Sequence, residues 1–286
     1  MKCEICPREC GADRVEKFGF CGCGETLRVA KIMVHRGEEP IISGKNGSGA
    51  IFFSGCVLKC PFCQNYPVSH EHFGRDITDE QLSEEILALQ EKNVHNINLV
   101  TPTQYLHRLI PMLEKLRPRL KIPVVMNTGG YEKAETIRRL DGLIDIYLPD
   151  LKYYSSELSA KYSAAPDYFE QASAALEEML RQQPKAEICD GIMKKGVIVR
   201  HLVLPGCYKD SMKLIEWLSI LPNRPLLSIM RQYTPCYKAA DFPELNRRIT
   251  TFEYRKVTDL CAELGFDGFT QEKGCETLDM TPVWEE

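Results

Sequence analysis

The sequence contains no apolar run long enough to cross a membrane, and its first residues include no apolar stretch typical of a signal peptide. We therefore expect a cytoplasmic protein without a membrane anchor. An excess of basic residues is also missing, because 36 lysines and arginines face 40 acidic residues and the net charge is −4. This balance argues against a nucleic-acid partner, which usually requires a basic surface. Repeats and low-complexity tracts are absent as well, which favours one large globular core.

Cysteine, in contrast, is frequent: the 286 residues include thirteen. In a reducing compartment such thiols bind metals more often than they form disulfides. Cys56, Cys60 and Cys63 follow a C-x3-C-x2-C spacing directly after an apolar run. Three thiolates can hold three irons of a four-iron cluster, and no fourth cysteine follows at ferredoxin-like spacing, so one iron stays open to a small-molecule ligand. This pattern predicts an iron–sulfur enzyme.

The same three cysteines could instead hold structural zinc if His70 or His72 supplied a fourth ligand. Their spacing is unusual for zinc, whose sites commonly pair C-x2-C units. With zinc here and near the start of the chain, the protein would be a non-catalytic zinc-binding adaptor. Iron and sulfide in the purified protein would exclude this alternative.

A second group of thiols lies near the start of the chain, at Cys3, Cys6, Cys10 and Cys21, with Cys23 as a spare or alternative ligand. A C-x2-C pair followed by two further cysteines suits tetrahedral zinc. An auxiliary iron–sulfur cluster is chemically possible too, because the glycines nearby free backbone amides to bond the sulfurs. We predict that residues 1–49 form a small cysteine-rich metal-binding extension, and the spacing leaves the metal open.

Strand-like and helical segments alternate from residue 50 onward, so we predict that residues 50–286 form a separate domain. Apolar runs of strand length recur six times, at Ala50–Ser54, Ile97–Thr101, Ile122–Asn127, Ile144–Leu148, Val197–Leu204 and Leu226–Gln232. Helical periodicity fills several of the gaps between them. Strands that alternate with helices predict an α/β fold with a parallel sheet, and six such units suggest a partial barrel.

Two helices are predicted between the fourth and fifth strands, over Ser155–Tyr162 and Pro166–Gln182, followed by a long loop over Gln183–Gly196. In parallel β/α folds the chemistry gathers in the loops that follow the C-terminal ends of the strands. The cysteine triad obeys this rule, because it directly follows the first strand. Polar residues at the other strand ends are therefore candidates for the same site.

Several strand ends carry such residues. Asp150 and Lys152 share one face of an extended segment, where opposite charges need partners or a ligand. Arg200 could bind a carboxylate through two hydrogen bonds, whereas His201 points to the opposite face and is expected to be packed. Asn127 precedes two glycines and either contacts a ligand or belongs to an ordinary turn.

The triad, with Phe62 before its last cysteine, resembles the signature of the radical S-adenosylmethionine (SAM) superfamily. With Asn127-Thr-Gly-Gly-Tyr131 and Asp150-Leu-Lys152, it makes about residues 50–270 similar to relatives of pyruvate formate-lyase activating enzyme, particularly an uncharacterised branch with a cysteine-rich N-terminus. The resemblance implies a partial (β/α)6 TIM-like barrel. It also implies a [4Fe-4S] cluster whose open iron binds SAM, reductive cleavage of SAM to a 5′-deoxyadenosyl radical, and abstraction of a hydrogen atom from the substrate.

The resemblance places SAM contacts at Phe62, Thr101, Thr103, Asn127, Asp150, Lys152 and Arg200. Family members commonly have a Gly-Gly-Glu segment where this chain has Thr101 and Thr103, and Thr103 could alternatively cap the following helix. The implied partners are a glycyl radical protein or peptide substrate and a low-potential electron donor such as flavodoxin or ferredoxin. Another peptide, a small metabolite or RNA are the alternative substrates.

Overall fold

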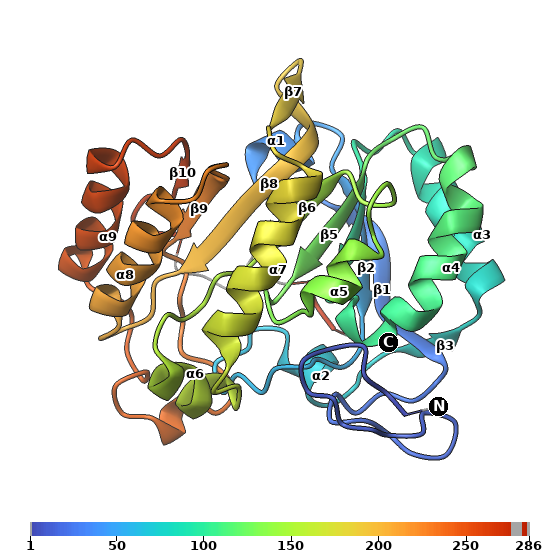
Figure 1. Ribbon diagram of the computed structural model, residues 1–286, viewed down its shortest axis with the longest axis horizontal. Coiled ribbons are helices and arrows are strands. Elements are labelled where there is room, and N and C mark those ends of the chain that lie inside the picture. The colour runs from blue at the N-terminus through green and yellow to red at the C-terminus, as the bar shows by residue number, and fades with distance from the viewer. Residues whose placement is uncertain (1, 276–281, 285–286) are drawn as a thin grey trace.

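The computed structural model describes residues 2–275 and 282–284 and shows one open, twisted sheet flanked by helices (Figure 1). The sheet order is β10-β9-β8-β6-β5-β4-β2-β1-β3, and β7 pairs with β8. The strands are β1 (Leu27–His35), β2 (Ser48–Phe53), β3 (Arg75–Ile77), β4 (Ile97–Val100), β5 (Val124–Thr128), β6 (Ile146–Pro149), β7 (Glu187–Cys189), β8 (Ile192–Leu202), β9 (Leu226–Met230) and β10 (Gly268–Thr270).

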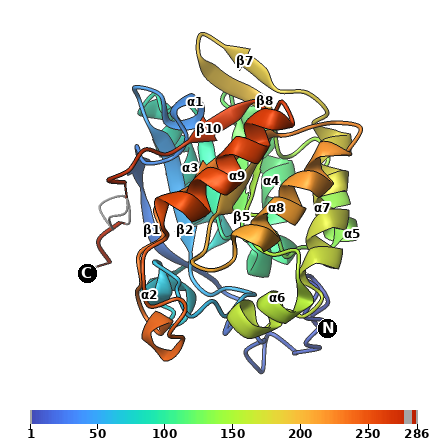
Figure 2. The ribbon, with the colours of Figure 1, turned by 90° about the vertical axis from the view of Figure 1, so that its left-hand side faces the viewer.

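The six predicted strands correspond to β2, β4, β5, β6, β8 and β9, which lie side by side in chain order and run parallel. At one edge β10 adds a further parallel strand, and at the other edge β1 and β3 pair antiparallel. The sheet does not close on itself, because β10 and β3 form its two edges (Figure 2). The prediction of an α/β fold with a partial TIM-like barrel is confirmed.

The crossover helices lie on the outer face of the sheet (Figures 1 and 2). Among the helices of residues 2–275 and 282–284, none is long and apolar enough to cross a membrane. The helices are α1 (Pro40–Ser43), α2 (Tyr66–Ser69), α3 (Asp79–Glu91), α4 (Leu106–Leu116), α5 (Ala134–Arg138), α6 (Ser156–Ser163), α7 (Tyr168–Gln182), α8 (Tyr208–Ser219) and α9 (Thr251–Glu263), with short 3-10 turns η1 (Thr103–Tyr105), η2 (Arg117–Arg119) and η3 (Ala239–Asp241).

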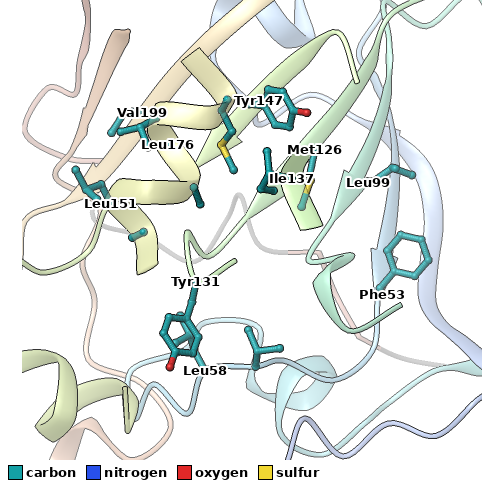
Figure 3. Close-up of a cluster of buried hydrophobic side chains, with 14 of the residues drawn as sticks. Phe53, Leu58, Leu99, Met126, Tyr131, Ile137, Tyr147, Leu151, Leu176 and Val199 are labelled. Carbon is teal, nitrogen blue, oxygen red and sulfur yellow. The ribbon is translucent and has the colours of Figure 1, made fainter. Parts of the chain in front are cut away.

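The main core lies between the sheet and these outer helices. Figure 3 shows Phe53, Leu99 and Met126 on the neighbouring strands β2, β4 and β5, and all three are almost fully buried. Burial of a side chain of this size stabilises the fold by about 1.5–3 kcal/mol. Leu58 and Tyr131 extend the same core beyond the strand ends. The loops that carry the candidate site therefore rest on packed apolar side chains.

One predicted loop differs from the structure. The long loop expected over Gln183–Gly196 is wrong, because this segment forms β7 and the start of β8 as an antiparallel hairpin. Asp190 and Gly191 form its two-residue turn, both with positive φ, and an Asp-Gly pair favours this hairpin geometry. In addition, Leu27–His35 pairs with β2, although the sequence division places it in the N-terminal extension. The division at residue 49 stays a prediction.

Candidate active site

The cysteine loop follows strand β2 and is fixed where it leaves the sheet. Gly55 turns the chain with a φ of 79°, a conformation that glycine adopts without strain. The side chain of Gln104 donates to the carbonyl oxygens of Ser54 and Gly55, at 3.0 Å each, and so links the loop to the segment after β4. The loop therefore starts in a defined direction before its three cysteines.

Each of the three thiols has a hydrogen-bonding partner. Cys60 Sγ lies 3.0 Å from Ser163 Oγ, and Cys63 Sγ lies 3.2 Å from Ser69 Oγ. A backbone amide donates to Cys56 Sγ at 3.4 Å. Cys60 is buried and the other two cysteines are half-buried. Hydrogen bonds of this kind stabilise negatively charged sulfur, so the surroundings suit thiolate ligands of a metal.

The thiols influence one another electrostatically. Burial and the charge of the neighbouring Cys60 raise the pKa of Cys56 to about 12 and that of Cys63 to about 11. Burial also raises the pKa of Cys60, although the charge of Lys152 opposes this effect. Without a bound cation these groups are therefore protonated thiols, and a metal must displace their protons when it binds.

This donor set fits an iron–sulfur cluster. A four-iron cluster distributes its thiolate ligands over separate irons, so its ligands need not converge on one ion. Within residues 2–275 and 282–284, no three His, Cys, Asp or Glu side chains lie in positions to share a single metal ion. Three thiols on one loop, each with a hydroxyl or amide partner, are the groups that a cluster requires.

Arg200 joins the ends of three strands in one polar network. Its Nε donates to Asp150 Oδ1 at 3.0 Å, and its Nη2 donates to Asn127 Oδ1 at 2.6 Å. Asp150 lies directly opposite Arg200 in the parallel register, and its Oδ2 accepts from Lys152 Nζ at 2.6 Å. Although burial opposes the change, the charges of Arg200 and Lys152 lower the pKa of Asp150. The structure thus brings four of the predicted site residues together.

The structure also shows the surroundings of His201 on β8, which the sequence predicts to be packed. His201 is buried on the opposite face from Arg200, with Nδ1 2.6 Å from Leu151 O and Nε2 2.8 Å from Ser211 Oγ. Both ring nitrogens have partners, so His201 is a packed histidine, as predicted.

Glu38 is part of this network, although nothing in the sequence singled it out. It lies between β1 and α1, and its Oε1 accepts from Asn98 at 2.9 Å and from Asn127 at 3.2 Å. Its Oε2 accepts from Arg200 Nη1 at 3.2 Å. Burial raises the pKa of Glu38 to about 7, although the charge of Arg200 opposes this effect. No local pattern marks a contact between residues 162 positions apart.

The two threonines after β4 have different environments. Thr101 has a φ of 56°, which is strained for a β-branched residue and is a conformation found mostly where other interactions enforce it. Thr103 is buried, and its Oγ1 donates to Glu132 Oε1 at 2.8 Å. The alternative role of Thr103 as a helix cap is wrong, because α4 begins at Leu106 after Tyr105 and has no side-chain cap.

Glu132 is a second carboxylate that the sequence reasoning missed. It is fully buried, and burial raises its pKa to about 7 despite hydrogen bonds from Thr128 and Thr103. Within the described part of the chain, its Oε2 is buried without a hydrogen-bond partner. Its position soon after Gly129 and Gly130, at the end of the third parallel strand, is the signal that could have identified it.

Phe62 packs against the segment that follows β9. Its ring centroid lies 5.8 Å from that of Tyr233, and both residues are buried. Cys236 Sγ donates to the carbonyl oxygen of Phe62 at 3.3 Å, and the amide of Lys238 donates to Pro61 O at 2.8 Å. The segment after the last strand of the partial barrel therefore covers the cysteine loop.

The N-terminal segment that carries the predicted ligands lies at the same end of the sheet as α2 (Figure 1). Cys3, Cys6 and Cys21 are buried, and Cys10 is exposed. Burial, together with the charges of the other three thiols, raises the pKa of Cys6 to about 12. The buried side chain of Arg14 donates from Nε to Cys3 Sγ at 3.1 Å. The four thiols therefore form one group with a cation beside it.

Cys23 and the two candidate histidines have other contacts. Cys23 Sγ donates to Ser54 O at 3.4 Å, so it faces the start of the cysteine loop. His70 Nδ1 lies 2.7 Å from Ser69 Oγ, and burial lowers the pKa of His70 to about 4. The ring of His72 lies against Gly22, where a Cβ would collide with it.

Comparisons with known proteins identify the family. The model of the Radical SAM superfamily matches residues 50–215. The uncharacterized protein MJ0674 of Methanocaldococcus jannaschii is 29% identical over 276 residues, which cover 93% of this chain and 75% of that protein. The chain belongs to the radical SAM superfamily, and it is therefore a radical SAM enzyme. Members of this family use a [4Fe-4S] cluster and SAM.

Solved structures share the fold at low sequence identity. SuiB of Streptococcus suis bound to S-adenosylmethionine has a TM-score of 0.54 and 15% identity, covering 77% of this chain and 49% of SuiB. A radical SAM methyltransferase from Sphaerobacter thermophilus has a TM-score of 0.50 and 12% identity, covering 78% of this chain and 67% of that protein. The chain thus spans about half the length of SuiB.

Proposed function

We propose that this protein activates a glycyl radical enzyme by removing a hydrogen atom from a glycine Cα of that partner. Cys56, Cys60 and Cys63 would hold the [4Fe-4S] cluster, whose chemistry would be the one-electron reductive cleavage of SAM to methionine and a 5′-deoxyadenosyl radical. That radical takes the hydrogen atom and becomes 5′-deoxyadenosine, and the glycine keeps the unpaired electron. A cytoplasmic flavodoxin or ferredoxin supplies the electron.

The observation that carries the proposal is the meeting of the cysteine loop with the ends of the third and fourth parallel strands. Burial raises the pKa of Cys60, and the charge of Lys152 opposes this rise. A Cβ added to Gly129 would lie 3.1 Å from Leu58 Cδ1 and 3.9 Å from Lys152 Cε, which shows how closely these segments approach. A ligand beside the cysteines therefore meets both strand ends.

The charges at these strand ends match the amino-acid moiety of SAM. Asp150 can accept a hydrogen bond from an ammonium group, and Lys152 and Arg200 can donate to a carboxylate. Neutral hydrogen-bonding groups and one aromatic wall complete the site that we assign to SAM: Thr101, Thr103, Asn127 and Phe62. SuiB has been captured with its precursor peptide SuiA, which supports a polypeptide substrate for this member of the superfamily.

The N-terminal thiols are the second metal site of this proposal. Cys3, Cys6, Cys10 and Cys21 bind an auxiliary cluster or zinc in this proposal, because these thiols are close enough for their charges to act on Cys6; zinc would have to draw them closer together than they lie in this structure. Metal and sulfide analysis of protein in which the three loop cysteines are replaced by alanine distinguishes the two. Zinc without sulfide indicates a structural site, and additional iron with sulfide indicates a cluster.

The test is anaerobic reconstitution with iron and sulfide, chemical reduction, and an assay for 5′-deoxyadenosine with SAM. Candidate glycyl radical proteins are then added, and the glycine radical is sought by electron paramagnetic resonance (EPR) spectroscopy. Iron no higher than background after reconstitution would contradict the iron–sulfur assignment, and zinc in both sites would indicate an adaptor. If 5′-deoxyadenosine forms together with a modified peptide or metabolite and no glycine radical is detected, that peptide or metabolite is the substrate instead of a glycyl radical protein.

A further inference from the structure

Arg8 connects the N-terminal segment with the cysteine loop. Its Nε donates to the carbonyl oxygen of Val57 at 2.8 Å, and its Nη2 donates to Ser163 O at 3.1 Å. The Nη1 group donates to Ala164 O. One guanidinium thus engages three carbonyl oxygens from two segments that are more than a hundred residues apart in the chain.

These contacts involve two of the three thiols indirectly. Val57 follows Cys56, so the bond from Arg8 fixes the carbonyl group next to this cysteine. Ser163 Oγ lies 3.0 Å from Cys60 Sγ, so the second bond fixes the backbone of the residue that contacts this thiol. Arg8 therefore holds the backbone beside two candidate cluster ligands without touching either sulfur.

The guanidinium is itself held in place. Its central carbon lies 4.2 Å from the ring centroid of Phe20 and 4.9 Å from that of Tyr131. Aromatic rings attract a cation placed over their faces. Three donors in a fixed plane, with rings beside it, form a geometry that the single ammonium of lysine cannot reproduce.

The segment that carries Arg8 is anchored to the barrel on both sides of the arginine. Thr136 Oγ1 donates to Ile5 O at 2.8 Å, and Lys133 forms an ion pair with Glu9. Both partners lie in or next to α5. Arg8 therefore links the barrel wall to the cysteine loop in a fixed position and is not a mobile surface side chain.

We infer that Arg8 is a positioning residue for the cluster: it holds the Cys56–Leu58 backbone and the Ser163 carbonyl in the arrangement in which the loop thiols receive iron. The N-terminal segment thus belongs to the wall of the catalytic centre, in addition to any metal that its own thiols bind. This inference rests on the proposed function only in assigning the cluster to Cys56, Cys60 and Cys63.

The first test measures how firmly the full-length protein holds its cluster. We expect Arg8→Ala, after reconstitution, to lose iron to a chelator with an apparent affinity about 10- to 100-fold below wild type, as for other residues that support metal ligands. The EPR spectrum of its reduced cluster should also change. Arg8→Lys should show the same defect, and the exposed Lys17→Ala should match wild type. Wild-type iron retention and EPR spectrum in Arg8→Ala would overturn the inference.

The second test uses metal-free protein and does not depend on cluster chemistry. We expect Arg8→Ala to raise the alkylation rates of Cys56 and Cys60, measured by peptide mass spectrometry, because the loop loses its anchor. Cys261, which lies on the buried face of α9, is the internal control for folding. If Cys261 also becomes reactive in Arg8→Ala, the fold of that variant is disturbed, and the alkylation rates of Cys56 and Cys60 are measured in Arg8→Lys instead. Unchanged loop reactivity overturns the inference, whereas failure of wild type to bind iron contradicts only the proposed function.

Discussion

Ser163, the last residue of α6, places its hydroxyl 3.0 Å from the thiol of Cys60, although the two residues lie 103 positions apart. The same hydroxyl lies 2.9 Å from Tyr153 OH, so it is fixed between a phenol and a thiol. A chain of two hydroxyl groups thus leads from the end of the fourth parallel strand to a candidate iron ligand. Hydrogen bonds to ligand sulfurs are one of the factors that set the reduction potential of a cluster.

Replacing Ser163 by alanine should lower the reduction potential of the cluster, because the lost hydrogen bond stabilises negative charge on the Cys60 sulfur. The measurement is a potentiometric titration followed by EPR. Ser173→Ala is the matched control, because its hydroxyl donates only to the backbone of its own helix. An unchanged potential in Ser163→Ala would show that the hydroxyl has no influence on the cluster.

Replacing Cys60 by alanine should abolish 5′-deoxyadenosine formation and leave the barrel folded, because the cysteine lies in a loop and not in the sheet. Product is measured by chromatography, and folding by circular dichroism. Cys189→Ala removes an exposed thiol from the β7–β8 hairpin and should keep full activity. Retained product formation by Cys60→Ala would count decisively against the cluster assignment.

Replacing Asp150 by asparagine should lower the free energy of unfolding by about 3 kcal/mol, because Arg200 and Lys152 lose the carboxylate that compensates their charges. The control is Asp141→Asn at the half-exposed ion pair with Arg181, where a loss of less than about 1 kcal/mol is expected. Urea denaturation measures both. Equal losses of unfolding free energy in the two variants would contradict the conclusion that Asp150 compensates the charges of Arg200 and Lys152.

Glu132 predicts a specific dependence of stability on pH. Its pKa is raised from 4.5 to about 7, so the native state holds the proton more strongly than the unfolded state. The contribution of Glu132 to stability is therefore full below about pH 4.5 and is lost as the pH rises to about 7. Asp150 and Lys152 are the nearby charged groups, with opposite effects on this carboxyl.

Replacing Glu132 by glutamine should remove this loss. The free energy of unfolding of the variant, relative to that of wild type, should rise by about 3 kcal/mol between pH 4.5 and pH 8. This amount corresponds to the difference between the ordinary and the raised pKa of Glu132. Urea denaturation at several pH values gives the comparison. A difference between the two proteins that does not change with pH would show that Glu132 does not titrate in this range.

The sequence predicted those parts of the site that follow from local pattern and from parallel topology. The cysteine triad could be recognised from the sequence because its three members lie close together in the chain. Asn127, Asp150 and Arg200 could be grouped because the carboxyl ends of parallel strands meet at one edge of the sheet. Their mutual hydrogen bonds follow from the register, in which Asp150 lies opposite Arg200.

The parts that sequence reasoning missed depend on contacts between segments with no shared periodicity. Glu38 reaches Arg200 across 162 positions, and Arg8 reaches Ser163 across 155. Both come from the first forty residues, in segments outside β1 that show no regular apolar periodicity. The β7–β8 hairpin was missed for a different reason: its Asp190-Gly191 turn is a strong local signal that went unused.

The hairpin has a practical consequence. It projects from the end of the sheet opposite the cysteine loop (Figure 1) and carries the exposed thiol of Cys189 beside the exposed side chain of Ile188. Two molecules can therefore meet tip to tip in air and become covalently linked, which would mimic a native dimer on a sizing column. Reducing agent, or serine at this position, should return such a sample to its original elution volume.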